Sequence, residues 1–306
     1  MDTDRLNAFI DAAQTLSFSE TAKHLHVTQP TVSKYIRDLE QTLGVNLFDR
    51  SGAGLHLTEA GQTILPWARR LVRECGRLED LARSLEGDVA GLLRIACTTT
   101  AGKYILPRLA ARFRQRHPNV QINILSCTQE NALEHLLGED AELGVVSYKA
   151  EASWLDCQHF FTDRIILIVN ANHRWADKQF IEPADLLEEP LIMREETSGT
   201  RRALLTELAA HDISLDDLDI FLEVGNAEAI VATVGAGVGV SFVSRMAAAY
   251  ALGFECIVEV PILGFDLSRN ISMVRRSLPV PNRAQDIFWA FINDPINDDL
   301  YRLASL

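Results

Sequence analysis

The stretch FSETAKHLHVTQPTVSKYIRDLE, residues 18–40, constrains the fold of this chain more than any other feature. From its second half onward, apolar residues recur at spacings of four, three and four, the period of a helix with one buried face. These residues are Val32, Ile36, Leu39 and Leu43. Thr28 is expected to cap this helix, and Pro30 falls in its first turn, where a missing N–H group costs little. The pattern predicts a helix packed against neighbouring helices.

Two further helices are expected upstream. Ser19 is the expected N-cap of a short helix that turns Ala22 and Leu25 inward. An earlier helix carries a stripe that can cover the pair, made of Leu6, Phe9, Ala13 and Leu16. After Gly44, the segment NLFDRSGAGLHLT predicts a two-stranded wing that turns at residues 51–54. The order indicates a winged helix-turn-helix, although a plain three-helix cluster fits the periodicity equally well.

The outer face of the capped helix is polar and basic. If this helix enters the major groove N-terminus first, Gln29 can pair with an adenine edge, and small Thr31 and Ser33 allow close approach. Lys34, Arg37 and Arg50 in the wing can reach phosphates, which position a protein without specifying sequence. The candidate DNA-contacting residues are Thr28, Gln29, Pro30, Thr31, Ser33, Lys34, Arg37 and Arg50.

The net charge of −13 argues against a generally basic DNA-binding protein. Residues 1–90 hold ten Lys and Arg against thirteen Asp and Glu, so this part is also slightly acidic. DNA binding must therefore depend on a few cations gathered on one face.

The segment FSETAKHLHVTQPTVSKYIRDLEQTLGVNLFDR, followed by LTEAG, resembles the N-terminal domain of LysR-type transcriptional regulators. The TQP start, the LG–LF–R run and the LT–AG exit match in order. The resemblance implies a sequence-specific DNA-binding regulator. One departure is Ala53, where many relatives carry a basic residue, which leaves Arg50 as the main phosphate contact of the wing.

A long helix capped by Thr58 is expected to run to about Ser84. Its apolar residues alternate at spacings of four and three over three heptads, which predicts helix-to-helix pairing in a dimer. The seam consists of Ile64, Ala68, Leu71, Cys75, Leu78, Ala82 and Leu85. Packing of this stripe on its own domain is the alternative. A two-fold dimer would place two recognition helices on a pseudo-palindromic operator, and Pro66 is expected to bend the helix.

From residue 92 strands and helices alternate, and their βαβαβ order predicts a parallel sheet with helices on both faces. Two α/β lobes match the effector-binding domain of the same family, which has a periplasmic-binding-protein-like fold. The expected domains are 1–58 (winged helix-turn-helix), 59–91 (dimerisation helix and hinge) and 92–306 (effector-binding). Within the last, lobe 1 covers about 92–161 and 266–306, and lobe 2 about 162–265.

Hydroxyl-rich turns follow several of the expected strands. Hydroxyls and free N–H groups at helix N-termini favour an anion, and the family binds effectors at these turns. The candidate effector-binding residues are Thr98, Thr99, Thr100, Thr128, Gln129, Ser147, Thr197, Ser198, Gly199 and Thr200. Each hydroxyl taken singly fits simple helix capping equally well. Arg201 either adds charge or pairs with Glu195 or Glu196.

The effector expected from this pattern is a small anionic metabolite, and the turns look most like the branch that regulates carbon-fixation or sulfur-assimilation genes. Other partners implied by the family are a second copy of the chain, with tetramers usual, and RNA polymerase. No metal, cofactor or membrane span is expected. The acidic start MDTDRLNAFI lacks the pattern of an export signal, which favours the cytoplasm.

Three alternatives remain. A redox-responsive regulator would use Cys97 and Cys127, which fall at the ends of strands expected to be neighbours. An enzyme is disfavoured because the glycine-rich segment 235–241 follows a helix and precedes a strand, the reverse of a phosphate-binding loop. A stand-alone solute-binding protein does not account for the helix-turn-helix.

Overall fold

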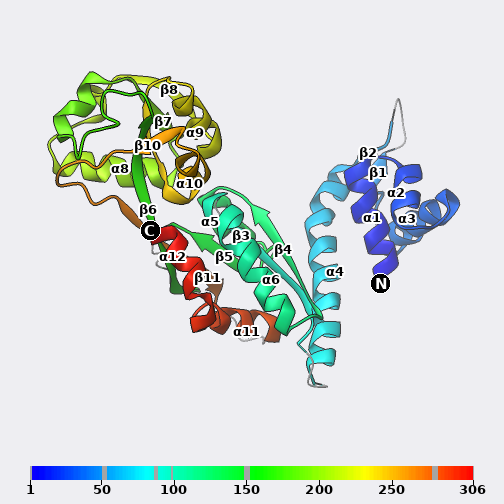
Figure 1. Cartoon of the computed structure of the whole chain (residues 1–306). Coiled ribbons are helices and arrows are strands. Elements are labelled where there is room, and N and C mark those ends of the chain that lie inside the picture. Colours follow the sequence, from blue (N-terminus) through cyan, green and yellow to red (C-terminus); the bar gives the residue numbers. More distant parts are fainter. Residues whose placement is uncertain are drawn as a thin grey trace. The chain divides into compact units, whose positions relative to one another are not determined.

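The computed structural model describes residues 2–49, 54–85, 89–97, 99–147, 152–277 and 282–305. The chain divides into two compact units, Met1–Asp88 and Val89–Leu306. Figure 1 shows the first unit in blue to cyan and the second in the remaining colours.

The first unit is a helical cluster with a small wing. Its elements are α1 (Thr3–Thr15), α2 (Phe18–His24), α3 (Gln29–Leu43), β1 (Phe48–Asp49), β2 (His56–Leu57) and α4 (Glu59–Leu85). Val32, Ile36 and Leu39 of α3 are buried, as the spacing predicts, and Gly44 ends α3 in the left-handed region with φ of 72°. β1 and β2 pair antiparallel on either side of the expected turn, of which residues 51–53 lie outside the described residues.

Two details of the first helices differ from expectation. Ser17, not Ser19, caps α2, because its side chain accepts a hydrogen bond from the Glu20 N–H and the helix already begins at Phe18. Leu16 lies past the end of α1 with φ of 50° and is 45% exposed, so it does not cover the helix pair. Both errors concern helix ends, where a shift of one or two residues changes which side chain is buried.

Side-chain oxygens that accept hydrogen bonds from backbone N–H groups fix the wing and the start of α4. The Glu40 carboxylate accepts hydrogen bonds from the N–H groups of Leu47 (2.8 Å) and Phe48 (3.2 Å). The Thr58 hydroxyl caps α4 by accepting from the Gly61 N–H at 3.0 Å, as expected. A Cβ atom on Gly61 would overlap the Leu47 carbonyl oxygen, so only glycine allows α4 to start this close to the wing.

The second unit begins with the expected βαβαβ order. Its elements are β3 (Gly91–Cys97), α5 (Thr99–Tyr104), α6 (Leu106–Arg116), β4 (Val120–Ser126), α7 (Gln129–Leu137) and β5 (Leu143–Val146). β3 pairs in parallel with both β4 and β5, which confirms the parallel sheet. Pro107 lies in the first turn of α6, and α5 and α6 are separated at Ile105.

The chain then enters the second lobe along β6 (Leu155–Asn170) and returns along β11 (Ser268–Arg276). Between them lie η1 (Pro183–Glu188), β7 (Leu191–Arg194), α8 (Gly199–Ala210), η2 (Leu215–Asp217), β8 (Ile220–Val224), α9 (Ala227–Gly235), β9 (Val240–Ser244), α10 (Arg245–Gly253) and β10 (Ile257–Glu259). After β11 come α11 (Arg283–Phe291), η3 (Pro295–Asn297) and α12 (Asp298–Ser305). The sequence patterns did not identify β7, α10, β10 or α12.

The strands of this unit follow the order β4-β3-β5-β11-β6-β9-β7-β8, and β10 pairs with β6. β6 and β11 run antiparallel and cross from one lobe to the other (Figure 1). Their register shifts between Ile271 and Ser272, which face Phe161 and His159, so Phe160 is an extra, bulged residue of β6.

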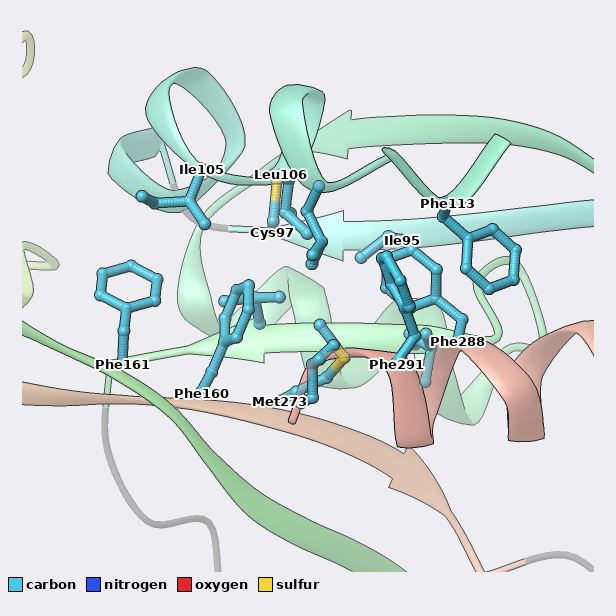
Figure 2. Close-up of a cluster of buried hydrophobic side chains, with 14 of the residues drawn as sticks. Ile95, Cys97, Ile105, Leu106, Phe113, Phe160, Phe161, Met273, Phe288 and Phe291 are labelled. Atoms are coloured by element: carbon cyan, nitrogen blue, oxygen red, sulfur yellow. The ribbon is translucent and has the colours of Figure 1, made fainter. Parts of the chain in front are cut away.

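Each lobe has its own hydrophobic core. In lobe 1 the rings of Phe113, Phe288 and Phe291 meet edge to face or tilted, and Phe160 and Phe161 both reach the same cluster (Figure 2). The lobe 2 core is built around Trp175, Leu204 and Phe242. Met246 of α10 in lobe 2 also joins the lobe 1 cluster, so the boundary between the lobes is held by this apolar contact, by polar contacts and by the two crossing strands.

Candidate functional site

The N-terminal half of α3 presents the expected polar face. Thr28 caps the helix and its hydroxyl lies 2.8 Å from the Thr31 hydroxyl, while the Gln29 amide donates to the Ser33 hydroxyl at 3.0 Å. Thr28, Gln29 and Pro30 are exposed, and Thr31 and Ser33 are half-buried. The face is therefore preorganised by hydrogen bonds among its own short side chains.

The cations of this face are accessible. Lys34 and Arg37 are exposed, and neither forms an ion pair with any other residue that the structure describes. Their charges are thus available to a polyanion. Arg50 and Ala53 lie outside the described residues, so the predicted phosphate contact of the wing stays a prediction.

The apolar stripe of α4 divides into two parts. Ala68 is buried in the core of the first unit, so it is not available to a dimer seam. Ile64 is half-buried against the same core, and its place in the seam stays a prediction. Leu71 and Leu78 are 44% and 67% exposed within the single chain, and Cys75 and Ala82 are also exposed. The side chain of Leu85 lies outside the described residues. Trp67, 63% exposed, was missed because it falls outside the strict heptad.

At the boundary of the two lobes, three of the predicted effector residues converge on Arg269 of β11. Arg269 Nη2 donates to the Thr100 hydroxyl of α5 at 3.2 Å. A Cβ atom placed on Gly199, the first residue of α8, would lie 3.0 Å from Arg269 Nη1 and would overlap the Ser147 hydroxyl oxygen. Glycine therefore allows the start of α8, the end of β5 and the guanidinium to meet.

Asp163 fixes the orientation of Arg269. The two residues are direct partners across β6 and β11, and Asp163 Oδ2 accepts from Arg269 Nε (2.9 Å) and Nη2 (2.7 Å). The Ser244 hydroxyl donates to the other oxygen of Asp163 at 2.6 Å, and Asp163 is fully buried. No hydrogen bond of Arg269 Nη1 is found among the described residues, so this group can take an acceptor from outside the chain.

Sequence patterns did not single out Arg269 or Asp163. The only local signal is an arginine directly before the apolar strand pattern of NISMV, and its meaning depends on the β6–β11 register.

Other predicted residues are not part of this convergence. Thr128 is exposed and caps α7, and Thr197 is exposed. Ser198 caps α8 by accepting from the Thr200 N–H. Thr98 lies outside the described residues, as do the side chains of Thr99 and Gln129.

Thr200 and Arg201 face away from the boundary. The Thr200 hydroxyl is buried in a narrow space lined by Met193, Leu204 and Phe242, on the core side of α8, and has no hydrogen-bond partner among the residues that the structure describes. Arg201 donates to the Glu223 carboxylate at 2.5 Å and to the Arg194 carbonyl at 3.0 Å. Of the two alternatives for Arg201, pairing with Glu195 or Glu196 is thus not observed among the described residues, and Glu195 pairs with Arg194.

A second polar contact joins the lobes nearby. Lys103 Nζ of α5 lies 2.8 Å from both oxygens of the Glu228 carboxylate in the first turn of α9, and the Tyr104 hydroxyl donates to the same carboxylate at 2.7 Å. Burial raises the pKa of Glu228, but the hydrogen bonds from Lys103 and Tyr104 outweigh it, and the net pKa is below its ordinary value. Glu228 is therefore ionised at neutral pH.

The two cysteines of the redox alternative are close but weakly reactive. The Cys127 N–H donates to the Cys97 carbonyl at 2.9 Å. Burial, with a smaller contribution from Cys127, raises the pKa of Cys97 to about 12, and burial also raises the pKa of Cys127. Because the thiolate is the reacting form, this environment does not favour a redox switch.

Comparison with known proteins identifies the family. Residues 3–62 match the model of the bacterial regulatory helix-turn-helix proteins of the lysR family, and residues 86–295 match the LysR substrate binding domain. The chain belongs to the LysR family of DNA-binding regulators. One relative is an uncharacterized HTH-type transcriptional regulator of Methanocaldococcus jannaschii, which is 32% identical over 93% of this chain and 96% of the relative. Another is the transcriptional activator CmpR of Synechocystis, which is 31% identical over 87% of this chain and 86% of the relative.

Solved structures agree with the fold. CbnR, a LysR family regulator, in complex with its target DNA has 25% identity and a TM-score of 0.73, over 95% of this chain and 99% of that chain. The CcmR regulatory domain of Synechocystis in complex with 2-PG has 26% identity and a TM-score of 0.59, over 70% of this chain and 97% of that chain. Among the described residues, no helix is long and apolar enough to cross a membrane.

Proposed function

We propose that this chain regulates transcription by binding a pseudo-palindromic operator as a dimer, and that a small anionic metabolite bound between the two lobes sets its activity. The observation that carries the effector assignment is the convergence of Thr100, Ser147 and Gly199 on Arg269. We also propose that the protein works in the cytoplasm.

The chemistry of the lobe boundary suits an acidic group. The guanidinium is held in place by a buried carboxylate, so it loses little conformational freedom when a ligand binds. The N-terminus of α8, capped by Ser198, adds partial positive charge at the same point. Arg269 and Asp163 together are neutral, so the preference for an anion comes from the direction of the guanidinium N–H groups and the α8 dipole.

Relatives support the effector class and the regulated genes. CmpR is named a transcriptional activator, a RuBisCO operon transcriptional regulator of Allochromatium vinosum is 29% identical over 89% of both chains, and the CcmR domain was solved with 2-PG. Of the two branches that the sequence suggests, we therefore propose the one that regulates carbon-fixation genes over the one that regulates sulfur assimilation.

The DNA contact combines α3 with dimerisation through α4. A few cations on the DNA-binding face of a slightly acidic unit, Lys34 and Arg37 among them, give weak non-specific binding, because affinity for DNA rises with the number of phosphates neutralised. Pairing two units through the exposed residues of α4, Leu71, Cys75, Leu78 and Ala82, doubles these contacts. Association of dimers into tetramers and contact with RNA polymerase are part of the proposal on family grounds.

The experiment that tests the effector site is a thermal-shift screen of small anions on the full-length chain, followed by footprinting with each anion that stabilises it. The matched variant carries Asp163→Asn and Arg269→Gln together, which keeps hydrogen-bonding groups in place and removes both charges. We expect the variant to retain DNA binding and to lose the thermal shift and the change in footprint. A variant that responds like the wild type would refute the assignment of Arg269.

A further inference from the structure

The contact of Glu228 with Lys103 and Tyr104 lies beside the proposed effector site. Thr100, which receives the hydrogen bond from Arg269, precedes Lys103 by three positions and Tyr104 by four. Residues at these spacings share one face of a helix, with about 5–6 Å between their Cβ atoms. The same face of α5 therefore carries two groups of polar side chains at the boundary between the lobes.

Both groups have the composition of an anion subsite. The first combines Thr100 with the Arg269 guanidinium. The second combines the ammonium of Lys103 with the hydroxyl of Tyr104, which is half-buried and remains protonated because burial and Glu228 raise its pKa. In this structure the second group holds the carboxylate of Glu228 from the opposite lobe, with all three hydrogen bonds at 2.7–2.8 Å.

We propose, on the basis of the proposed function, that Glu228 occupies a second anion subsite of the effector pocket, and that the effector carries two acidic groups. One acidic group binds at Arg269 and Thr100. The other replaces the Glu228 carboxylate at Lys103 and Tyr104. Glu228 is an internal competitor, so a ligand with a single acidic group leaves it in place.

The ion pair between Lys103 and Glu228 is partly exposed to solvent, so a metabolite can compete with Glu228 for Lys103. The side chains of Lys103 and Glu228 are 42% and 40% exposed, so their attraction is screened by water and the pair is easier to separate than a buried pair. A displaced Glu228 remains hydrated, and the first turn of α9 continues to stabilise its negative charge. The structural cost of displacement is therefore small.

Matched pairs of probes test the number of acidic groups. Succinate and butyrate differ only in the second carboxylate, and 3-phosphoglycerate and glycerol 3-phosphate differ mainly in the same way. Isothermal titration calorimetry on the full-length chain gives the affinity of each probe. In the wild type we expect the two-acid member of each pair to bind more tightly.

Variants then separate the competitor from the subsite. Glu228→Gln removes the charge of the competitor and should tighten the two-acid probes by about three- to fivefold, as expected for loss of a partly exposed ion pair, while single-acid probes change little. Lys103→Met should remove the preference for a second acidic group. Glu223→Gln is the control, because Glu223 pairs with Arg201 within lobe 2 and no ion pair joins it to lobe 1 among the described residues. It should change the affinity of neither class of probe.

The outcomes distinguish this proposal from the proposed function. If Glu228→Gln weakens or does not change two-acid binding, Glu228 is a structural tie and the two-acid inference is wrong. If Glu228→Gln gives that result and the double variant with Asp163→Asn and Arg269→Gln loses all anion binding, the effector site at Arg269 is supported and the second subsite is not. If no probe binds either the wild type or Glu228→Gln, the two-acid inference is also overturned, and operator binding decides independently whether the regulator function holds.

Discussion

The pair formed by Asp163 and Arg269 makes the most demanding prediction about stability. The side chain of Asp163 is fully buried and that of Arg269 is 10% exposed, and the Ser244 hydroxyl shares the carboxylate. Asp163→Ala would leave a nearly buried guanidinium without its counter-charge and remove the acceptor of a buried hydroxyl. Loss of one partner of a buried ion pair costs about 3–5 kcal/mol of unfolding free energy. For a unit of this size that corresponds to a drop in Tm of about 6–20 °C.

Urea denaturation of the full-length chain, followed by circular dichroism, measures this loss. The double variant Asp163→Ala with Arg269→Met removes both charges and should be more stable than Asp163→Ala alone, because no unpaired buried charge remains. Glu188→Ala is the control: its pair with Arg174 is exposed at both ends, so the free energy of unfolding should change by less than about 0.5 kcal/mol. If Asp163→Ala stays within about 1 kcal/mol of the wild type, or if the double variant loses the sum of both single losses, the pair does not hold the lobes as described.

Other predictions concern the DNA-binding face, the dimer and the thiols. Gln29→Ala should reduce discrimination between operator and random duplex in gel shifts, whereas Lys34→Ala should weaken both duplexes alike and reduce the slope of affinity against salt by about one; equal losses from both variants would contradict the roles assigned to them. Leu78→Glu should convert dimers to monomers in light scattering with little change in the unfolding free energy of the single chain, since Leu78 is 67% exposed. Iodoacetamide at pH 8 should label the exposed Cys256 and leave Cys97 unlabelled in native protein, because its pKa of about 12 keeps it protonated; rapid labelling of Cys97 would restore the redox alternative.

Local patterns predicted the first unit well because its information lies close together in the sequence. Thr28, Pro30, the buried stripe of α3 and Gly44 act within one helix, and their roles need no knowledge of distant partners. The heptad of α4 predicted less well which of its apolar residues are exposed in the single chain. A spacing of three and four residues is the same whether a helix packs on its own domain or on a second chain, so Ile64 and Ala68 could not be separated from Leu71.

The lobe boundary was predictable only in part. Thr100, Ser147 and Gly199 follow strands or begin helices, and those positions can be read from sequence. Arg269 and Asp163 are 106 positions apart, and Lys103 and Glu228 are 125 apart, so their pairing depends on strand register and lobe packing. Thr200 is a hydroxyl residue at a helix start, as expected for a site residue, but its side chain points into the lobe 2 core, and the sequence pattern does not show which way a side chain points.

The bulge at Phe160 changes which residues of β6 face the core. In a regular strand, neighbours point to opposite faces, yet Phe160 and Phe161 both join the lobe 1 cluster (Figure 2). Before the bulge even-numbered positions face this cluster, as Gln158 does when it donates to the Trp289 carbonyl, and after it odd-numbered positions do. Even-numbered residues before the bulge and odd-numbered residues after it therefore lie on the same face of β6. β11 keeps its pairing on both sides of the bulge, with Ile271 opposite Phe161 and Ser272 opposite His159. The extra residue therefore places a second phenylalanine in the lobe 1 core while Asp163 stays opposite Arg269.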